Sequence, residues 1–161
     1  MINLIKDINL LLEDFSFQSR NIKGRQGQKE KIKEDKIKKF WDKLGDINKV
    51  KYLIKETFKK YYEVLEIGGD DFLKEHQSSL FIFILIDNRI WFNIFISLDN
   101  EMKIDLVINN RGDEDWGDVE YESRINLPEI SFDNIRKTIQ EFLNTDIVKL
   151  KIKNAKSNYK I

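Results

Sequence analysis

The sequence predicts an α+β protein, because the spacing of its apolar residues changes along the chain. Over residues 2–66 they recur at intervals of three and four, the period of an amphipathic helix. Over residues 80–127 the pattern changes to the period of two that is typical of strands. Two polar pairs, Asp87-Asn88 and Asp99-Asn100, interrupt this second region and are typical of hairpin turns. We therefore expect helices first and an antiparallel meander after them.

Three helices are predicted before the sheet. The first covers residues 2–18 and is followed by a flexible loop at 18–28 that contains two glycines. The second covers about 29–44. Asp46 is a favourable N-cap for the third, at 47–66, and the pair Gly68-Gly69 would end it.

Four strands, a helix and a fifth strand are predicted next. They are the strands Leu80–Ile86, Ile90–Leu98, Met102–Ile108 and Val119–Leu127, a helix at 132–143 capped by Ser131, and a strand at 148–153. Leu80–Ile86 is apolar on both faces, so we expect it to lie inside the sheet. The lysines that alternate along 148–153 suit an edge strand beside it. The prediction is a mostly antiparallel five-stranded meander sheet, order 5-1-2-3-4, with N-terminal helices and one C-terminal crossover helix.

Composition favours a single cytoplasmic domain. We expect one domain over 1–161, with a lysine-rich helical part (1–66), a part made of sheet and helix (78–153) and a basic tail (154–161). The absence of cysteine excludes disulfides and thiolate metal sites and fits a reducing compartment. We expect no signal peptide and no membrane association, since the longest apolar run has seven residues and roughly 20 are needed to span a bilayer. Nothing in the sequence indicates a cofactor or a small-molecule substrate.

Charge is separated along the chain although the total is zero. Residues 1–62 carry 16 basic and 9 acidic residues, a net charge of +7, and residues 63–146 carry 7 and 19, a net charge of −12. Residues 147–161 carry five lysines and no acid. Separated charge of this kind influences how fast a protein meets its partners and which partners it meets.

The acidic block and the outward side of the second strand hold the residues that we expect to bind a partner. They are Asp113, Glu114, Asp115, Trp116, Asp118, Glu120, Glu122, Trp91 and Phe95. Six of the nine are acids on one loop and the adjoining strand, and we expect them to dock onto a basic surface. Trp91 and Phe95 lie on the sheet face opposite the predicted core, which either the N-terminal helices or a partner must cover. A solvated acidic loop, or a Ca²⁺-binding loop, is the alternative for the acids.

Nucleic-acid binding is a second expected function, through the basic loop and helix near the N-terminus. The candidate residues are Arg20, Lys23, Arg25, Lys29, Lys33 and Lys36. Among them, Gly24-Arg25-Gln26-Gly27 resembles the Gly-x-x-Gly clamp of KH domains, which implies contact with a nucleic-acid backbone. The alternative is a solvated lysine-rich helix, in which the interspersed acids pair with the lysines.

A third expected function is a metal-dependent nuclease. Asp87 followed by Glu101-Met102-Lys103 looks like the Asp…Glu-x-Lys layout of such enzymes, in which the two carboxylates hold Mg²⁺. The predicted strands place Asp87 and Glu101 at opposite ends of the second strand, roughly 30 Å apart, which is too far for one ion. The single histidine, His76, comes with no Gly-x-Ser-x-Gly turn, so no catalytic triad is indicated.

The sequence thus favours a non-catalytic, cytoplasmic binding protein that acts through a protein partner, in the style of small immunity, inhibitor or chaperone proteins. Its segregated charge and its outward aromatic residues support this interpretation.

Overall fold

A computed structural model describes residues 31–73, 79–110 and 117–158 of the chain. It divides the chain into two compact units, residues 1–38 and residues 39–161, and the five strands and the helices from residue 47 onward belong to the second. A helix at 31–44 ends at Gly45, where φ is +84° and the amide donates to the Trp41 carbonyl at 2.6 Å. Glycine fits this position because other residues rarely adopt such a φ.

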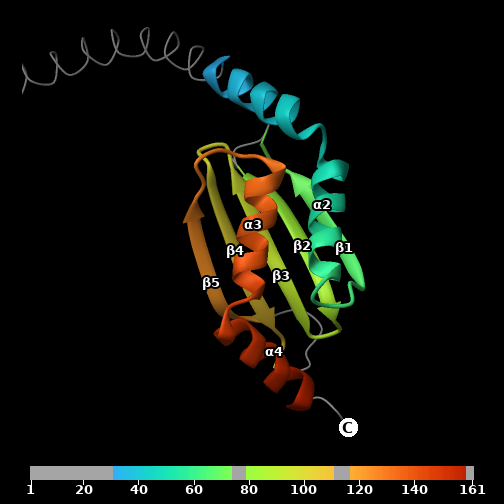
Figure 1. The fold of residues 1–161 in the computed structure, drawn as a ribbon. Helices are drawn as coiled ribbons and strands as arrows, with labels where there is room; N and C mark the ends of the chain where they lie inside the picture. Colours follow the sequence, from blue (N-terminus) through green and yellow to red (C-terminus); the bar gives the residue numbers. More distant parts are fainter. Residues whose placement is uncertain (1–30, 74–78, 111–116, 159–161) are drawn as a thin grey trace, which may run out of the picture. The chain divides into compact units, whose positions relative to one another are not determined.

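The sheet is an antiparallel meander in which sequence order and spatial order coincide (Figure 1). Its strands are β1 (Glu66–Asp71), β2 (Ser79–Asp87), β3 (Ile90–Ser97), β4 (Glu101–Ile108) and β5 (Asp118–Asn126). Each strand pairs antiparallel with the next. The α+β class and the five-stranded antiparallel sheet are therefore confirmed.

The predicted strand order 5-1-2-3-4 is wrong, because a different segment occupies the edge beside β2. Glu66–Asp71 forms that edge strand, whereas the predicted third helix included residue 66 and ended at the glycine pair. The helix that begins at Ile47 ends at Lys59 instead. The prediction that β2 has neighbours on both sides holds, since β1 and β3 flank it.

Residues 148–153 are helical and lie within α4 (Asp146–Asn158), so the predicted last strand is also wrong. Val148, Ile152 and Ala155 are buried and follow one another at the spacing of a single helix face. Leu150 gave the segment its apparent alternation, yet this residue is 57% exposed. The lysines between these residues lie on the solvated sides of a helix and not on a sheet edge.

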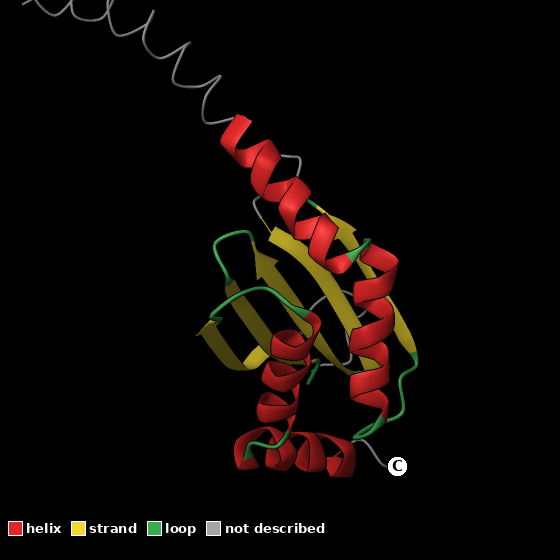
Figure 2. Ribbon diagram, turned by 45° about the horizontal axis from the view of Figure 1, so that its top comes forward, coloured by secondary structure: helices red, strands yellow, loops and turns green. Residues whose placement is uncertain are grey.

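Two helices cover one face of the sheet, which we call the inner face (Figures 1 and 2). Asp46 caps α2 (Ile47–Lys59) by accepting from the Lys49 amide at 3.0 Å. Ser131 caps α3 (Phe132–Leu143) in the same way, as predicted, by accepting from the Asn134 amide at 3.2 Å. Both helices lie on the inner face, since Phe92 of β3 contacts a phenylalanine ring from each. The helix at 47–59 therefore does not cover the opposite face.

The core lies between these helices and the inner face. Alternate residues of β2, β3 and β4 point into it and are fully or almost fully buried, among them Ile82, Ile94 and Ile104. Burial of each such side chain stabilises the fold by about 1.5–3 kcal/mol before the loss of chain entropy is counted. Among the helices of 31–73, 79–110 and 117–158, none is both long and apolar enough to cross a membrane.

The β1 assignment predicts that Gly69→Ala destabilises the protein. Gly69 has φ +153°, and a Cβ there would collide with the Phe81 carbonyl of β2. We expect the free energy of unfolding to fall by about 1–3 kcal/mol, measured by chemical denaturation, with Asp70→Ala as the control in the same strand. A variant as stable as the wild type would contradict the close approach of Gly69 to the Phe81 carbonyl.

Candidate functional site

The candidate site is the face of the sheet opposite α2 and α3, which we call the outer face. Figure 1 shows α2 and α3 over the inner face, and no helix of residues 47–158 lies over the outer one. Strand register places nineteen residues on it, in neighbouring rows. They are Glu66, Gly68 and Asp70 on β1; Ser79, Phe81, Phe83 and Leu85 on β2; Trp91, Asn93, Phe95 and Ser97 on β3; Glu101, Lys103, Asp105 and Val107 on β4; and Val119, Glu122, Arg124 and Asn126 on β5.

Aromatic rings form the centre of the outer face. The Phe81 ring lies 5.1 Å from the Phe95 ring and 6.4 Å from the Phe83 ring, measured between centroids. The Lys103 ammonium lies 5.0 Å from the centroid of Phe95, in cation–π geometry. All of these side chains are half-buried. We call Phe81, Phe83 and Phe95 the aromatic cluster.

Two glycines allow backbone to lie against rings of this face. A Cβ at Gly68 would overlap the Phe83 ring, so the ring rests on the bare backbone of the edge strand. A Cβ at Gly117 would collide with Trp91 and Val107. The chain's own backbone therefore covers part of the Phe83 ring at Gly68 and part of the Trp91 ring at Gly117.

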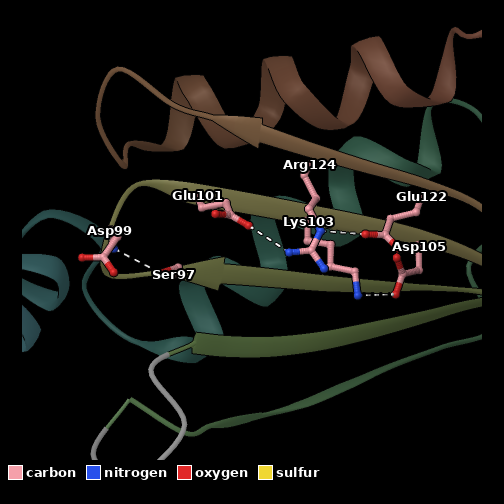
Figure 3. A network of polar contacts seen from close by, with 7 residues as sticks. All are labelled: Ser97, Asp99, Glu101, Lys103, Asp105, Glu122 and Arg124. Atoms are coloured by element: carbon pink, nitrogen blue, oxygen red, sulfur yellow. Dashed lines mark hydrogen bonds and ion pairs between the residues drawn. The ribbon is translucent and has the colours of Figure 1, made fainter.

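A charged network occupies the β4–β5 side of the outer face (Figure 3). Arg124 contacts Glu122 at 2.7 Å and Glu101 at 3.5 Å, and Lys103 contacts Asp105 at 3.4 Å. Register sets like charges opposite one another, Lys103 across from Arg124 and Asp105 across from Glu122. Like charges in directly opposite positions are destabilising. The ion pairs within each strand and along the diagonal offset that repulsion.

Asp105 is the unusual member of this network. It is 4% exposed, and its Oδ1 has no hydrogen-bond partner, while its Oδ2 contacts Lys103. Burial raises the pKa of the Asp105 carboxyl, although the neighbouring Lys103 ammonium opposes the rise. Leaving a buried polar atom unsatisfied costs about 1–3 kcal/mol, so the protein retains a destabilising group at this position.

The outer face carries an excess of negative charge. Its acids are Glu66, Asp70, Glu101, Asp105 and Glu122, and its bases are Lys103 and Arg124, a net charge of −3. The opposite side of the domain differs. A hollow of about 860 Å³ beside α2 and the start of α3 is lined by four bases, which are Lys49, Lys59, Lys60 and Arg136, and by two acids, Asp46 and Glu56. The two sides of this unit thus differ in the sign of their charge.

A small hollow lies at one end of the outer face. Its volume is about 250 Å³, and its lining residues are Ser79, Phe95, Ser97, Glu101 and Lys103. Ligand pockets for drug-sized molecules are commonly about 300–1,000 Å³. This hollow fits a single side chain of a partner better than a free substrate.

The structure brings three of the predicted partner-binding residues together. Trp91, Phe95 and Glu122 all lie on the outer face. Asp118 is exposed at the start of β5, and Glu120 lies apart from the outer-face rows, with its carboxylate 3.3 Å from Lys151 of α4. Asp113, Glu114, Asp115 and Trp116 lie outside the described residues, so their role stays a prediction.

The nucleic-acid candidates are described only in part. Lys33 and Lys36 lie in the helix at 31–44, and both are engaged in interactions. Arg20, Lys23, Arg25 and Lys29 lie outside the described residues, as does His76, and so does the Gly-x-x-Gly segment. Binding of nucleic acid through these residues stays a prediction.

The nuclease layout is not assembled. Asp87 pairs with Ile90 at one end of β3, and Glu101 begins β4 at the other end. Seven residue steps along a strand separate these ends by about 23 Å, whereas ligands of one ion lie within a few ångströms of it. Among the described residues, no three His, Cys, Asp or Glu side chains are placed to hold a metal ion together.

Sequence reasoning missed the network of Lys103, Asp105 and Arg124 as part of a binding surface. Alternation along the third predicted strand does place Lys103 and Asp105 on the outward side. The pairing with Arg124 depends on the register of β4 with β5, which contains a bulge between Leu106 and Val107. An aspartate inside the apolar run 102–108 was the only available signal.

Comparison with known proteins does not assign a function. No protein-family model matches the chain, and neither the curated proteins nor the solved structures that were compared include a significant match. The function must therefore be argued from the site itself.

The burial of Asp105 predicts a pH-dependent gain in stability for Asp105→Asn. A carboxyl whose pKa is raised by folding contributes most to stability below its unfolded pKa and loses that contribution as pH rises through its folded pKa. The groups that act on it are Lys103, Glu122 and Arg124. We expect the melting temperature of the variant minus that of the wild type to grow from pH 4 toward pH 7.

Calorimetry across this pH range measures the difference, and Asp133→Asn, which removes an exposed charge from α3, controls for net charge. A difference that shrinks as the pH rises would show that Asp105 is stabilised as a carboxylate.

Proposed function

We propose that this chain is a non-catalytic binding protein whose partner is another protein, and that it binds through the outer face. One observation carries the proposal. The sheet of residues 66–126 has one face that α2, α3 and α4 leave uncovered, and that face combines an aromatic cluster with a charged network. Protein interfaces have this composition, with aromatic and arginine residues at the centre and polar groups at the rim.

The form of the outer face supports a protein over a small molecule. Its aromatic cluster spans neighbouring strands and is not enclosed, and the hollow beside it has room for about one side chain. A flat surface of this kind gains affinity from many contacts over a large area, as a protein partner provides. A small ligand requires a concave site that buries most of its surface.

Charge supports a protein over a nucleic acid. Aromatic rings on an open sheet are also a platform on which the bases of single strands stack, so this alternative has a specific observation in its favour. Affinity for nucleic acid comes mainly from neutralising phosphates with lysine and arginine. The outer face has a net charge of −3, and both of its bases are already engaged with acids. Phosphate would be repelled there.

The acidic loop remains part of the proposal. Asp113, Glu114, Asp115 and Trp116 directly precede Gly117, whose backbone lies against Trp91. Asp118 follows as an exposed residue. We propose that these acids accelerate association with a partner that first meets the outer face, since charges at the rim of an interface act mainly on the association rate.

We predict that Phe95→Ala reduces recovery of the partner by about tenfold or more. The tagged full-length chain is used as bait in an extract of the source cells, and bound proteins are quantified by mass spectrometry. A truncated anchor residue commonly weakens binding by 1.4 kcal/mol or more, about tenfold. Tyr52→Ala is the control, because this tyrosine is exposed on α2 on the other side of the domain.

A second variant separates binding from folding. Asn93→Arg leaves the aromatic cluster intact and places a bulky side chain between Phe83 and Asp105. We expect it to block the partner while thermal unfolding remains cooperative. If Tyr52→Ala removes the partner and both outer-face variants retain it, the binding surface lies on the helical side and the proposal is wrong.

A further inference from the structure

The outer face presents acids around an aromatic centre. Glu66 and Asp70 of β1 lie opposite Leu85 and Phe81 of β2, so they border the aromatic cluster on one side. The charged network borders it on the other. Lys103 pairs with Asp105, and Arg124 pairs with Glu122 and Glu101. After these pairs are formed, the outer face still has a net negative charge around its aromatic rings.

Asp105 gives this negative surface a carboxylate oxygen that lacks a hydrogen-bond partner. Its side chain is 6% exposed, and one carboxylate oxygen has no partner. Solvent and salt screen a buried charge less than an exposed one, so this carboxylate contributes strongly to the potential above the face. Lys103 contacts the other carboxylate oxygen of Asp105. Its side chain is flexible and 26% exposed, so it can move when a second cation binds.

The protein already contains one example of the contact that such a surface favours. The Lys103 ammonium lies over the Phe95 ring and beside the Asp105 carboxylate at once. A cation between an aromatic face and a carboxylate gains from both. The neighbouring Phe81 ring has a carboxylate beside it as well, since Asp70 lies directly across from it in the register of β1 and β2. A cation supplied from outside would have both a ring and a carboxylate as partners there.

We propose that the partner presents a basic segment, with arginine or lysine side chains that lie over the aromatic cluster and pair with the acids of the outer face. This inference rests on the proposed function and specifies the chemistry of the partner. Arginine is the better fit, since its planar guanidinium stacks on aromatic rings and offers five donors to carboxylates. A second copy docking by its own outer face is disfavoured, because two surfaces of net charge −3 would be opposed.

The test uses a fluorescein-labelled peptide in which arginine alternates with threonine, and fluorescence anisotropy measures its binding to the full-length chain. We expect saturable binding that weakens as salt is added. The matched peptide with glutamate in place of arginine, and a labelled single-stranded oligonucleotide, should both fail to bind the outer face. Tighter binding of the oligonucleotide through the outer face would overturn the proposal and favour the nucleic-acid alternative.

Charge-matched variants locate the site. Glu66→Gln with Asp70→Asn, and separately Asp105→Asn, should weaken the arginine peptide by about three- to tenfold. The control, Asp133→Asn with Glu141→Gln, removes two acids from the exposed side of α3 and should change the affinity by less than twofold. Equal weakening by the two double variants would mean that the peptide responds only to net charge, and the proposal would fail.

Amide chemical shifts of the wild-type protein locate the bound peptide without any substitution, so a variant that fails to fold cannot affect the result. The arginine peptide should shift β1, β2, β3 and β4 resonances and leave α2 and α3 unchanged. Failure of this inference is distinguishable from failure of the proposed function. If the partner is lost from Phe95→Ala but the arginine peptide leaves β1–β4 unshifted, the outer face binds a partner of different chemistry.

Discussion

The contact of Phe92 with two helices determines which side of this sheet is buried. Its ring centroid lies 4.9 Å from that of Phe58 in α2 and 6.0 Å from that of Phe142 in α3. Side chains alternate between the two faces along a strand, so the face on which Phe92 lies decides the face of all the remaining residues of β3. The register then decides it for the residues of the neighbouring strands. The aromatic and charged residues of the outer face are therefore placed by the packing of the inner one.

The sequence predicted most of this arrangement, because the inner-face pattern is strong. The strands from residue 79 to 126 and the helix at 132–143 were expected within a residue or two of their observed ends. These segments have long, regular apolar patterns and clear turn or capping residues. Trp91 and Phe95 were assigned to the outward side for the same reason, and that assignment is confirmed.

The edge strand could not be predicted, because its sequence carries no strand pattern. Glu66–Asp71 reads Glu-Ile-Gly-Gly-Asp-Asp, which has one large apolar residue and two glycines. Glycine is a poor strand former, and a pair of them is an ordinary helix terminator. The two glycines are explained by their contacts with β2. The Phe83 ring packs on the backbone of Gly68, and Gly69 lies against the Phe81 carbonyl. The edge was misassigned to 148–153 because exposed Leu150 mimicked the alternation of a strand.

The charged network shows a related limit, since it depends on pairing between strands. Lys103 and Arg124 are twenty-one positions apart in sequence, and only the register makes them neighbours. Evolution toward stability alone would tend to replace a buried, half-satisfied carboxylate such as Asp105 with an apolar residue, which is often neutral or stabilising at such positions. The charge of Asp105 has a stabilising role, since its contact with Lys103 helps to offset the repulsion between Lys103 and Arg124. That contact leaves Oδ1 buried without a hydrogen-bond partner, a cost of about 1–3 kcal/mol. We interpret this remaining cost as the consequence of the binding role that we propose for the outer face.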